Sequence, residues 1–104
     1  MVNDLTDGTA NKGYRILVVD DEEDLCEILK FNLETEGYTV ETANSAEEAL
    51  TLDIASFNLL LLDVMMGGMS GYSLAKKLKA APATAQIPII FLTARDSEND
   101  TITG

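Results

Sequence analysis

Two short apolar runs, each closed by aspartate, constrain the fold of this chain most. Residues 15–19 read Arg-Ile-Leu-Val-Val and are followed at once by Asp20 and Asp21. Residues 59–62 are all leucine and are followed by Asp63. A short, continuous apolar run is typical of a strand that is buried on both faces, as in a parallel sheet. We therefore expect an α/β fold built around a buried parallel sheet.

Helical spacing follows the first of these runs. Leu25, Ile28, Leu29 and Leu33 stand at i, i+3, i+4 and i+8. This spacing predicts a helix that starts at Glu22 and turns these four side chains toward the core.

Strands and helices alternate along the rest of the chain. Residues 38–43 alternate in polarity, which predicts a strand. Ser45 is followed three residues later by Glu48, a pattern typical of a capping box at the start of a helix. Such alternation implies right-handed crossovers and a parallel sheet covered on both faces. The predicted order is a strand over 15–19, a helix from 22, a strand over 38–43, a helix from 45 to about 54, a strand over 59–62, a glycine-rich flexible loop over 67–71, a helix over 72–79, a strand over 89–92 and the start of a helix in 97–104.

The charge balance and the missing residue types exclude several functions. The chain has 104 residues, with 18 acidic and 7 basic side chains, and a net charge of −11. At this length we expect one domain, and so acidic a chain is not expected to bind nucleic acid, because phosphate contacts need clustered Lys and Arg. No histidine is present, which excludes His-based catalysis and His-ligated metals. A metal here would be a hard cation held by oxygen, such as Mg²⁺ or Ca²⁺.

The N-terminal residues and the single cysteine bear on localisation. Residues 1–13 are polar and without periodicity, so we expect a flexible leader there rather than a signal peptide, and the domain over 14–104. The leucine run is far too short to span a membrane. Cys26 excludes an internal disulfide and is expected to be a small buried group. We therefore expect a soluble, cytoplasmic protein without a membrane partner.

Polar side chains stand at the carboxyl ends of three predicted strands. Asp20 and Asp21 follow the first strand, Asp63 the third, and Thr93 the fourth. Open parallel sheets bind their ligands beyond this edge. If the first and third strands are neighbours, three carboxylates converge and repel one another. A divalent cation such as Mg²⁺ would relieve that repulsion.

A structural explanation competes with the functional one at these positions. The helix macrodipole favours acids in a first turn, which accounts for Glu22, Glu23 and Asp24 but not for Asp20, since Asp20 follows an apolar strand directly. For Asp63 the alternative is a loop or capping aspartate. Threonine is common at strand ends. Three methionines nearby are more typical of packing than of a cofactor contact: Met65, Met66 and Met69.

Four short motifs occur in a fixed order. They are ILVVDDE over 16–22, LDVMM over 62–66, MSGY over 69–72 and IPIIFLTA over 87–94. Together they resemble the receiver domain of response regulators in two-component signalling, and the resemblance covers 15–104. It implies a flavodoxin-like, three-layer αβα fold with a parallel sheet in the order 2-1-3-4.

The resemblance also implies a metal site. Asp21 would ligate Mg²⁺ directly, and Asp20 would act through water. Asp63 would be the second carboxylate ligand, and the backbone carbonyl of Met65 a third ligand.

A phosphoacceptor role is implied in the same way. Asp63 would be phosphorylated by a partner sensor histidine kinase, which makes the domain a regulatory module rather than an enzyme. Thr93 would hydrogen-bond the phosphoryl group and change rotamer on activation, while the backbone amides of Met65 and Ala94 face its oxygens. An output domain or partner protein would receive the signal.

The sequence departs from the family pattern in two places. Gly67 stands where the family usually has proline, which should make the loop after Asp63 more mobile. The sequence stops at Gly104, so the fifth strand with its phosphate-binding lysine and the fifth helix are absent from it. The strand over 89–92 would then be a sheet edge, and we expect a homodimer or an exchange of elements through that edge.

Two further functions remain as alternatives to phosphoryl acceptance. One is a receiver-like interaction module that binds partners without phosphorylation, which the absent lysine would suit and the intact acid pocket opposes. The other is a small flavodoxin-like enzyme or flavin binder. Such a protein needs a glycine-rich phosphate loop after its first strand, and this sequence has no G-x-G-x-x-G there.

Overall fold

A parallel sheet forms the centre of the molecule. The computed structural model describes residues 13–66 and 68–92, and all element counts refer to these. Four strands lie in the order β2-β1-β3-β4, and every neighbouring pair is parallel. The predicted α/β fold and its strand order are therefore confirmed. The strands are β1 Arg15–Val19, β2 Thr39–Ala43, β3 Leu59–Asp63 and β4 Ile89–Leu92.

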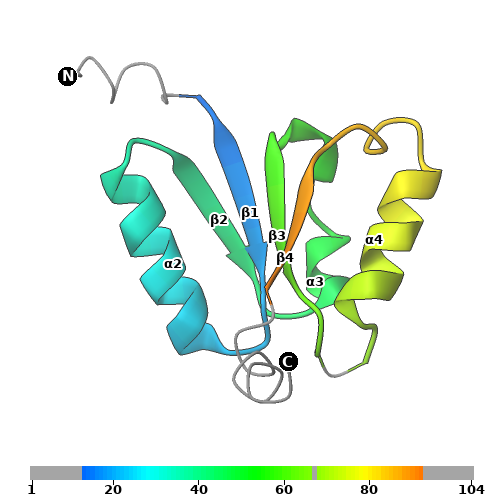
Figure 1. Ribbon diagram of the computed structural model, residues 1–104, viewed down its shortest axis with the longest axis horizontal. Helices are drawn as coiled ribbons and strands as arrows, with labels where there is room; N and C mark the ends of the chain where they lie inside the picture. Colours follow the sequence, from blue (N-terminus) through cyan, green and yellow to red (C-terminus); the bar gives the residue numbers. More distant parts are fainter. Residues whose placement is uncertain (1–12, 67, 93–104) are drawn as a thin grey trace, which may run out of the picture.

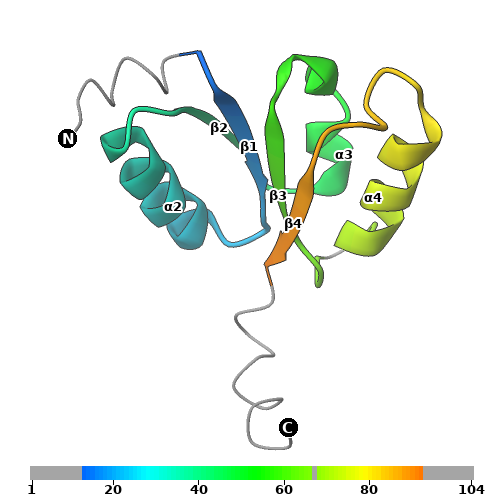
Figure 2. The same ribbon diagram turned by 45° about the horizontal axis from the view of Figure 1, so that its top comes forward.

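Helices cover both faces of the sheet and make three layers (Figure 1). Helix α2, Glu23–Thr35, lies on one face. Helix α3, Ala46–Ala49, and helix α4, Gly71–Ala80, lie on the other (Figure 2). A separate 3₁₀ turn, Ile54–Ser56, precedes β3. The single helix expected from 45 to about 54 is therefore wrong in extent, because it ends at Ala49 and the chain turns before the 3₁₀ segment.

The core explains why residues 16–19 of β1 and 59–62 of β3 are all apolar. Successive side chains of a strand point to opposite faces, and here both faces are covered. Leu17 and Leu62 pack on the side of α3 and α4. Ile16 and Leu61 pack on the side of α2. A polar residue at any of these apolar positions would therefore be buried beneath a helix.

The buried face of α2 differs from the predicted one. Cys26 is buried and Leu29 and Leu33 pack beside it, whereas Ile28 is 56% exposed and Phe31 is 70% exposed. Each residue turns an α-helix by about 100°, which places Ile28 and Phe31 well away from the line through Cys26, Leu29 and Leu33. The prediction for Ile28 is wrong because the sheet selects the face that carries the small cysteine.

Capping contacts begin two of the helices. The Ser45 hydroxyl accepts a hydrogen bond from the Glu48 backbone N–H at 2.9 Å, as the capping box predicts. The Glu48 carboxylate accepts in return from the N–H of Asn44, one residue before the cap, at 2.8 Å. The Ser70 hydroxyl caps α4 by accepting from the Ser73 N–H at 3.1 Å. Gly71, placed in a flexible loop by its sequence, is instead the first residue of this helix.

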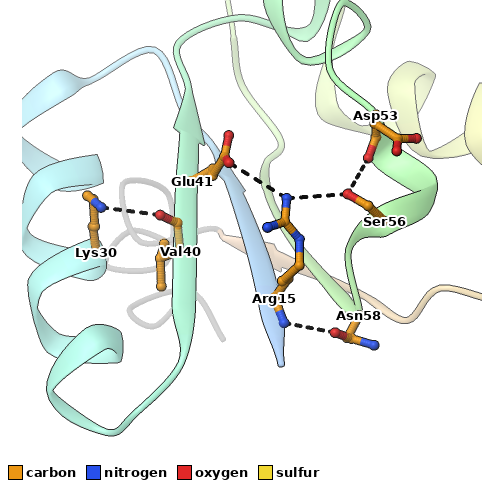
Figure 3. Close-up of polar contacts among 7 residues, drawn as sticks. All are labelled: Arg15, Lys30, Val40, Glu41, Asp53, Ser56 and Asn58. Atoms are coloured by element: carbon orange, nitrogen blue, oxygen red, sulfur yellow. Dashed lines mark hydrogen bonds and ion pairs between the residues drawn. The ribbon is translucent and has the colours of Figure 1, made fainter. Parts of the chain in front are cut away.

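Polar contacts around Arg15 tie β1 to its neighbours where the strand begins (Figure 3). The Arg15 backbone N–H donates to the Asn58 side-chain oxygen at 2.8 Å. Its guanidinium donates to the Ser56 hydroxyl at 3.3 Å and lies 3.6 Å from the Glu41 carboxylate. The guanidinium also stacks over the Phe57 ring at 4.7 Å. These contacts fix the end of β1 opposite to the aspartates.

Strand β4 has no fully buried residue, unlike the other three strands. Within the described residues it pairs with β3 alone, and Ile90 is 52% exposed. Phe91 is partly covered by the Tyr72 ring, with ring centroids 4.8 Å apart. An apolar edge of this kind is a template for pairing with another strand.

We expect the 104-residue polypeptide to associate through the β4 edge. Lysine on an edge strand opposes pairing, so Ile90→Lys should lower the association constant measured by sedimentation at several concentrations, by about tenfold or more. Ile28→Lys is the matched control, since Ile28 is equally exposed but lies on α2. Equal effects of both variants, or a monomeric parent chain, would contradict association through this edge.

Candidate functional site

The register of β1 and β3 brings three aspartates together. Val19 lies opposite Leu62, so Asp20 and Asp63, the next residues, stand at the same edge of the sheet. Asp21 follows Asp20 directly. One carboxylate oxygen from each of the three lies within 4.8 Å of the others. The predicted convergence of these carboxylates is therefore present in the structure.

Two of the three carboxylates are buried. Asp20 is 2% exposed and Asp63 is 4% exposed, whereas Asp21 is exposed. The Asp20 carboxylate accepts a hydrogen bond from the Glu22 N–H at 2.9 Å. The Asp63 carboxylate accepts one from the Met65 N–H at 3.3 Å. Each is a local turn contact of the kind that aspartate makes in loops. Such a turn gives no reason to bury the acid, and a buried charge is costly unless an opposite charge offsets it.

The backbone of Asp20 is held from two other elements. Its N–H donates to the Ala43 carbonyl, at the end of β2, at 3.0 Å. Its carbonyl accepts from the Asn44 side-chain amide at 3.1 Å and from the Cys26 thiol at 3.3 Å. The sequence interpretation missed Asn44. The signal was available, because Asn44 directly follows β2 and so stands at the same edge of the sheet as the aspartates.

Cys26 is buried, as expected, and its thiol has a defined partner. Burial raises the pKa of this thiol from its ordinary value of 9.0 to about 11, and the negative charge of Asp20 adds to the effect. The thiol therefore stays protonated at neutral pH and keeps its hydrogen bond to Asp20.

The remaining residues that the sequence points to fall into three sets. Met65 is exposed, and its N–H points at the Asp63 carboxylate, while the ligand role of its carbonyl remains a prediction. Met66 and Met69 pack against the core, as expected for packing residues. Three further positions of interest lie outside the described residues: Gly67, Thr93 and Ala94.

The family model for the response regulator receiver domain matches residues 16–104. This chain therefore belongs to the receiver domain family, and its four-stranded parallel sheet has the flavodoxin-like arrangement of that family.

Individual relatives agree with this assignment. The phosphate regulon transcriptional regulatory protein PhoB of Rhizobium meliloti is 43% identical over 91 residues, which are 86% of this chain and 40% of that protein. This chain thus spans about two fifths of the length of that relative.

Solved receiver structures are also similar. The non-phosphorylated receiver domain of HemR from Leptospira biflexa has a TM-score of 0.72 and 35% identity, covering 88% of this chain and 73% of that one. The response regulator TrrA from Thermotoga maritima, solved in complex with Mg²⁺-BeF, has a TM-score of 0.63 and 28% identity. The match covers 86% of this chain and 96% of the TrrA chain. In the part of the chain that the structure describes, no helix is long and apolar enough to cross a membrane.

The thiol of Cys26 should be unreactive in the folded protein. Thiolate is the reacting form, and both the raised pKa and burial suppress it. At pH 8 the reaction with a disulfide reagent should be at least about a hundredfold slower in buffer than in concentrated urea. Prompt reaction in buffer would show that α2 readily separates from the sheet and exposes the Cys26 thiol.

Removing one charge from the aspartate cluster should stabilise the protein without metal. Asp63→Asn keeps an oxygen that can accept from Met65, and it removes a buried charge. We expect urea unfolding in the presence of a chelator to show a gain of roughly 1–2 kcal/mol. The control Asp53→Asn, an exposed acid outside the cluster, should change stability by less than about 0.5 kcal/mol. A clear loss of stability in Asp63→Asn would favour a purely structural role for this aspartate.

Proposed function

We propose that this chain is a phosphoryl-accepting signalling module, in which a sensor histidine kinase phosphorylates Asp63 with the help of Mg²⁺. The observation that carries the proposal is the cluster of Asp20, Asp21 and Asp63 at the carboxyl edge of a receiver-family sheet. Two of its members are buried, which is an unfavourable arrangement that a bound cation would relieve.

The donor set suits Mg²⁺. Every candidate ligand is an oxygen, and Mg²⁺ binds one or two carboxylates while keeping several waters. In this proposal Asp21 and Asp63 ligate the ion directly, Asp20 acts through water, and the Met65 carbonyl completes the protein ligands. The Mg²⁺-BeF complex of the related TrrA supports the proposal. When bound, the ion would neutralise negative charge on the carboxylates and on the phosphoryl oxygens.

Asp63 acts as the nucleophile. One of its carboxylate oxygens attacks the phosphorus of a phosphohistidine in line, a P–O bond forms, and the P–N bond to the imidazole breaks. The leaving nitrogen keeps the electron pair of that bond, and the product on Asp63 is an acyl phosphate. The histidine must come from the partner, because this chain has none.

Phosphorylation changes both the charge and the hydrogen bonding at Asp63. The carboxylate that accepts from the Met65 N–H becomes an acyl phosphate, and the new phosphoryl oxygens become the stronger acceptors. The Met65 amide, the Ala94 amide and the Thr93 hydroxyl are the groups proposed to bind them. The resulting rearrangement would be passed to an output domain or partner protein in the cytoplasm.

Intact-mass measurement tests the proposal. Incubation with acetyl phosphate and Mg²⁺ should add one phosphoryl group per chain, and a chelator should prevent it. Asp63→Asn should remain unmodified, whereas Asp53→Asn should be modified like the parent chain. In addition, Mg²⁺ should raise the melting temperature of the parent chain and not that of Asp63→Asn, since only a ligand that binds the folded state stabilises it.

Two outcomes would overturn the assignment. Equal labelling of Asp63→Asn would show that another group accepts the phosphoryl. Absence of both labelling and Mg²⁺ binding in the parent chain would favour an interaction module that works without phosphorylation.

A further inference from the structure

We infer that Gly71 is a positioning residue for Asp63, a role that rests on the proposed phosphoacceptor function. The absence of a side chain at Gly71 lets the first residue of α4 lie directly against the backbone of Asp63 and Val64. This contact sets where the Asp63 carboxylate stands relative to Asp20 and Asp21.

Main-chain atoms occupy the position that a Cβ atom at Gly71 would need. A Cβ atom there would meet the carbonyl oxygen of Asp63 first, then the Asp63 carbonyl carbon at 2.8 Å and the Val64 Cα at 3.1 Å. All three are backbone atoms, so no side-chain rotation could relieve the overlap. Gly68 contrasts with it, because a Cβ at Gly68 would meet only the flexible end of the Glu47 side chain, at 3.2 Å.

Glycine is needed at position 71 for space and not for backbone conformation. The described glycines with positive φ are Gly13, Gly37 and Gly68, and Gly71 is not among them. It is instead the first helical residue of α4 and is buried. An alanine would therefore suit the local backbone and the helix, and its only cost is the overlap with Asp63 and Val64.

The overlap can be relieved most easily on the side of Asp63. Helix α4 is fixed to the core by its buried side chains Leu74 and Leu78. The Gly71 N–H also donates to the Val64 carbonyl at 3.1 Å, which couples the two segments. Val64, by contrast, is joined to the described part of β4 by a long hydrogen bond, from its N–H to the Leu92 carbonyl at 3.4 Å. A side chain at position 71 should therefore displace Asp63 and the turn that follows it.

The size of this displacement matters for the chemistry. Ordinary contact begins near 3.4 Å, so the Asp63 carbonyl carbon at 2.8 Å would have to move by about half an ångström or more. Phosphoryl transfer depends on positioning, and displacements of this order cost roughly tenfold to a hundredfold in rate.

Gly71→Ala in the full chain tests the inference. We expect the variant to lose about tenfold or more in Mg²⁺ affinity and in the rate of phosphorylation by acetyl phosphate. Leu78→Val is the matched control, since it weakens the packing of the same helix two turns away from Asp63. Both variants are compared under conditions where circular dichroism shows each to be folded. An equal loss of Mg²⁺ affinity and phosphorylation rate in the two variants, or no loss in Gly71→Ala, would overturn the positioning role.

A second measurement separates this inference from the proposed function. In amide NMR spectra without metal, Gly71→Ala should shift the resonances of Val64 and Met65 more than Leu78→Val does. If the parent chain neither binds Mg²⁺ nor takes up phosphoryl, the proposed function fails, and these shifts alone decide whether Gly71 positions Asp63. Unmoved resonances overturn the inference in either case.

Partial unfolding of Gly71→Ala is controlled in the same experiment. Trimethylamine N-oxide favours the compact state, so both variants are also measured in its presence. If Gly71→Ala is still phosphorylated slowly when the osmolyte has restored its fold, the inference is supported. If its phosphorylation rate recovers to that of Leu78→Val, Gly71 serves folding alone.

Discussion

The pairing of β1 with β3 is the constraint on which the rest of this structure depends. The two strands are almost entirely buried and parallel, with Val19 opposite Leu62. Aspartates that are remote in the sequence therefore leave the sheet side by side. Their position follows from apolar packing, because a one-residue slip of either strand would turn its side chains to the opposite layer. Packing in the hydrophobic core thus fixes the positions of the aspartates, although they lie at the edge of the sheet beyond that core.

Backbone contacts from several elements refine that geometry. Asp20 is held through its own main chain by the end of β2, by Asn44 and by the Cys26 thiol. Asp63 is the last residue of β3, where it lies opposite Leu92 of β4, and Gly71, the first residue of α4, lies against its backbone. These contacts act on the main chain of the two aspartates, while the carboxylates accept separate hydrogen bonds from the Glu22 and Met65 N–H groups. The proposed function, in which the site accepts a divalent ion and a phosphoryl group, needs such a fixed arrangement of the repelling charges.

Much of the fold could be predicted from residue patterns, and the failures have physical causes. The strands at 15–19, 59–63 and 89–92 follow from continuous apolar runs, and the capping box correctly placed the start of α3. The buried face of α2 was misjudged at Ile28, since several faces of that helix carry apolar residues and only the sheet selects one. The sequence predicts Gly71 to be a loop residue, whereas it begins α4, because a glycine required for lack of space looks the same in sequence as one required for flexibility.

The sequence alone determined that strands and helices alternate, that the sheet is buried, and that any metal must be held by oxygen, since these follow from periodicity and composition. It also placed aspartates at strand ends. That β1 and β3 are neighbours is implied by the family resemblance and by no local pattern. Only the tertiary structure decided that the carboxylates at their ends lie within 4.8 Å and that α4 rests on the backbone of Asp63. The reason is that contact between segments distant in sequence depends on how layers pack. A local pattern states which face of an element is apolar, but it does not state which other element that face meets.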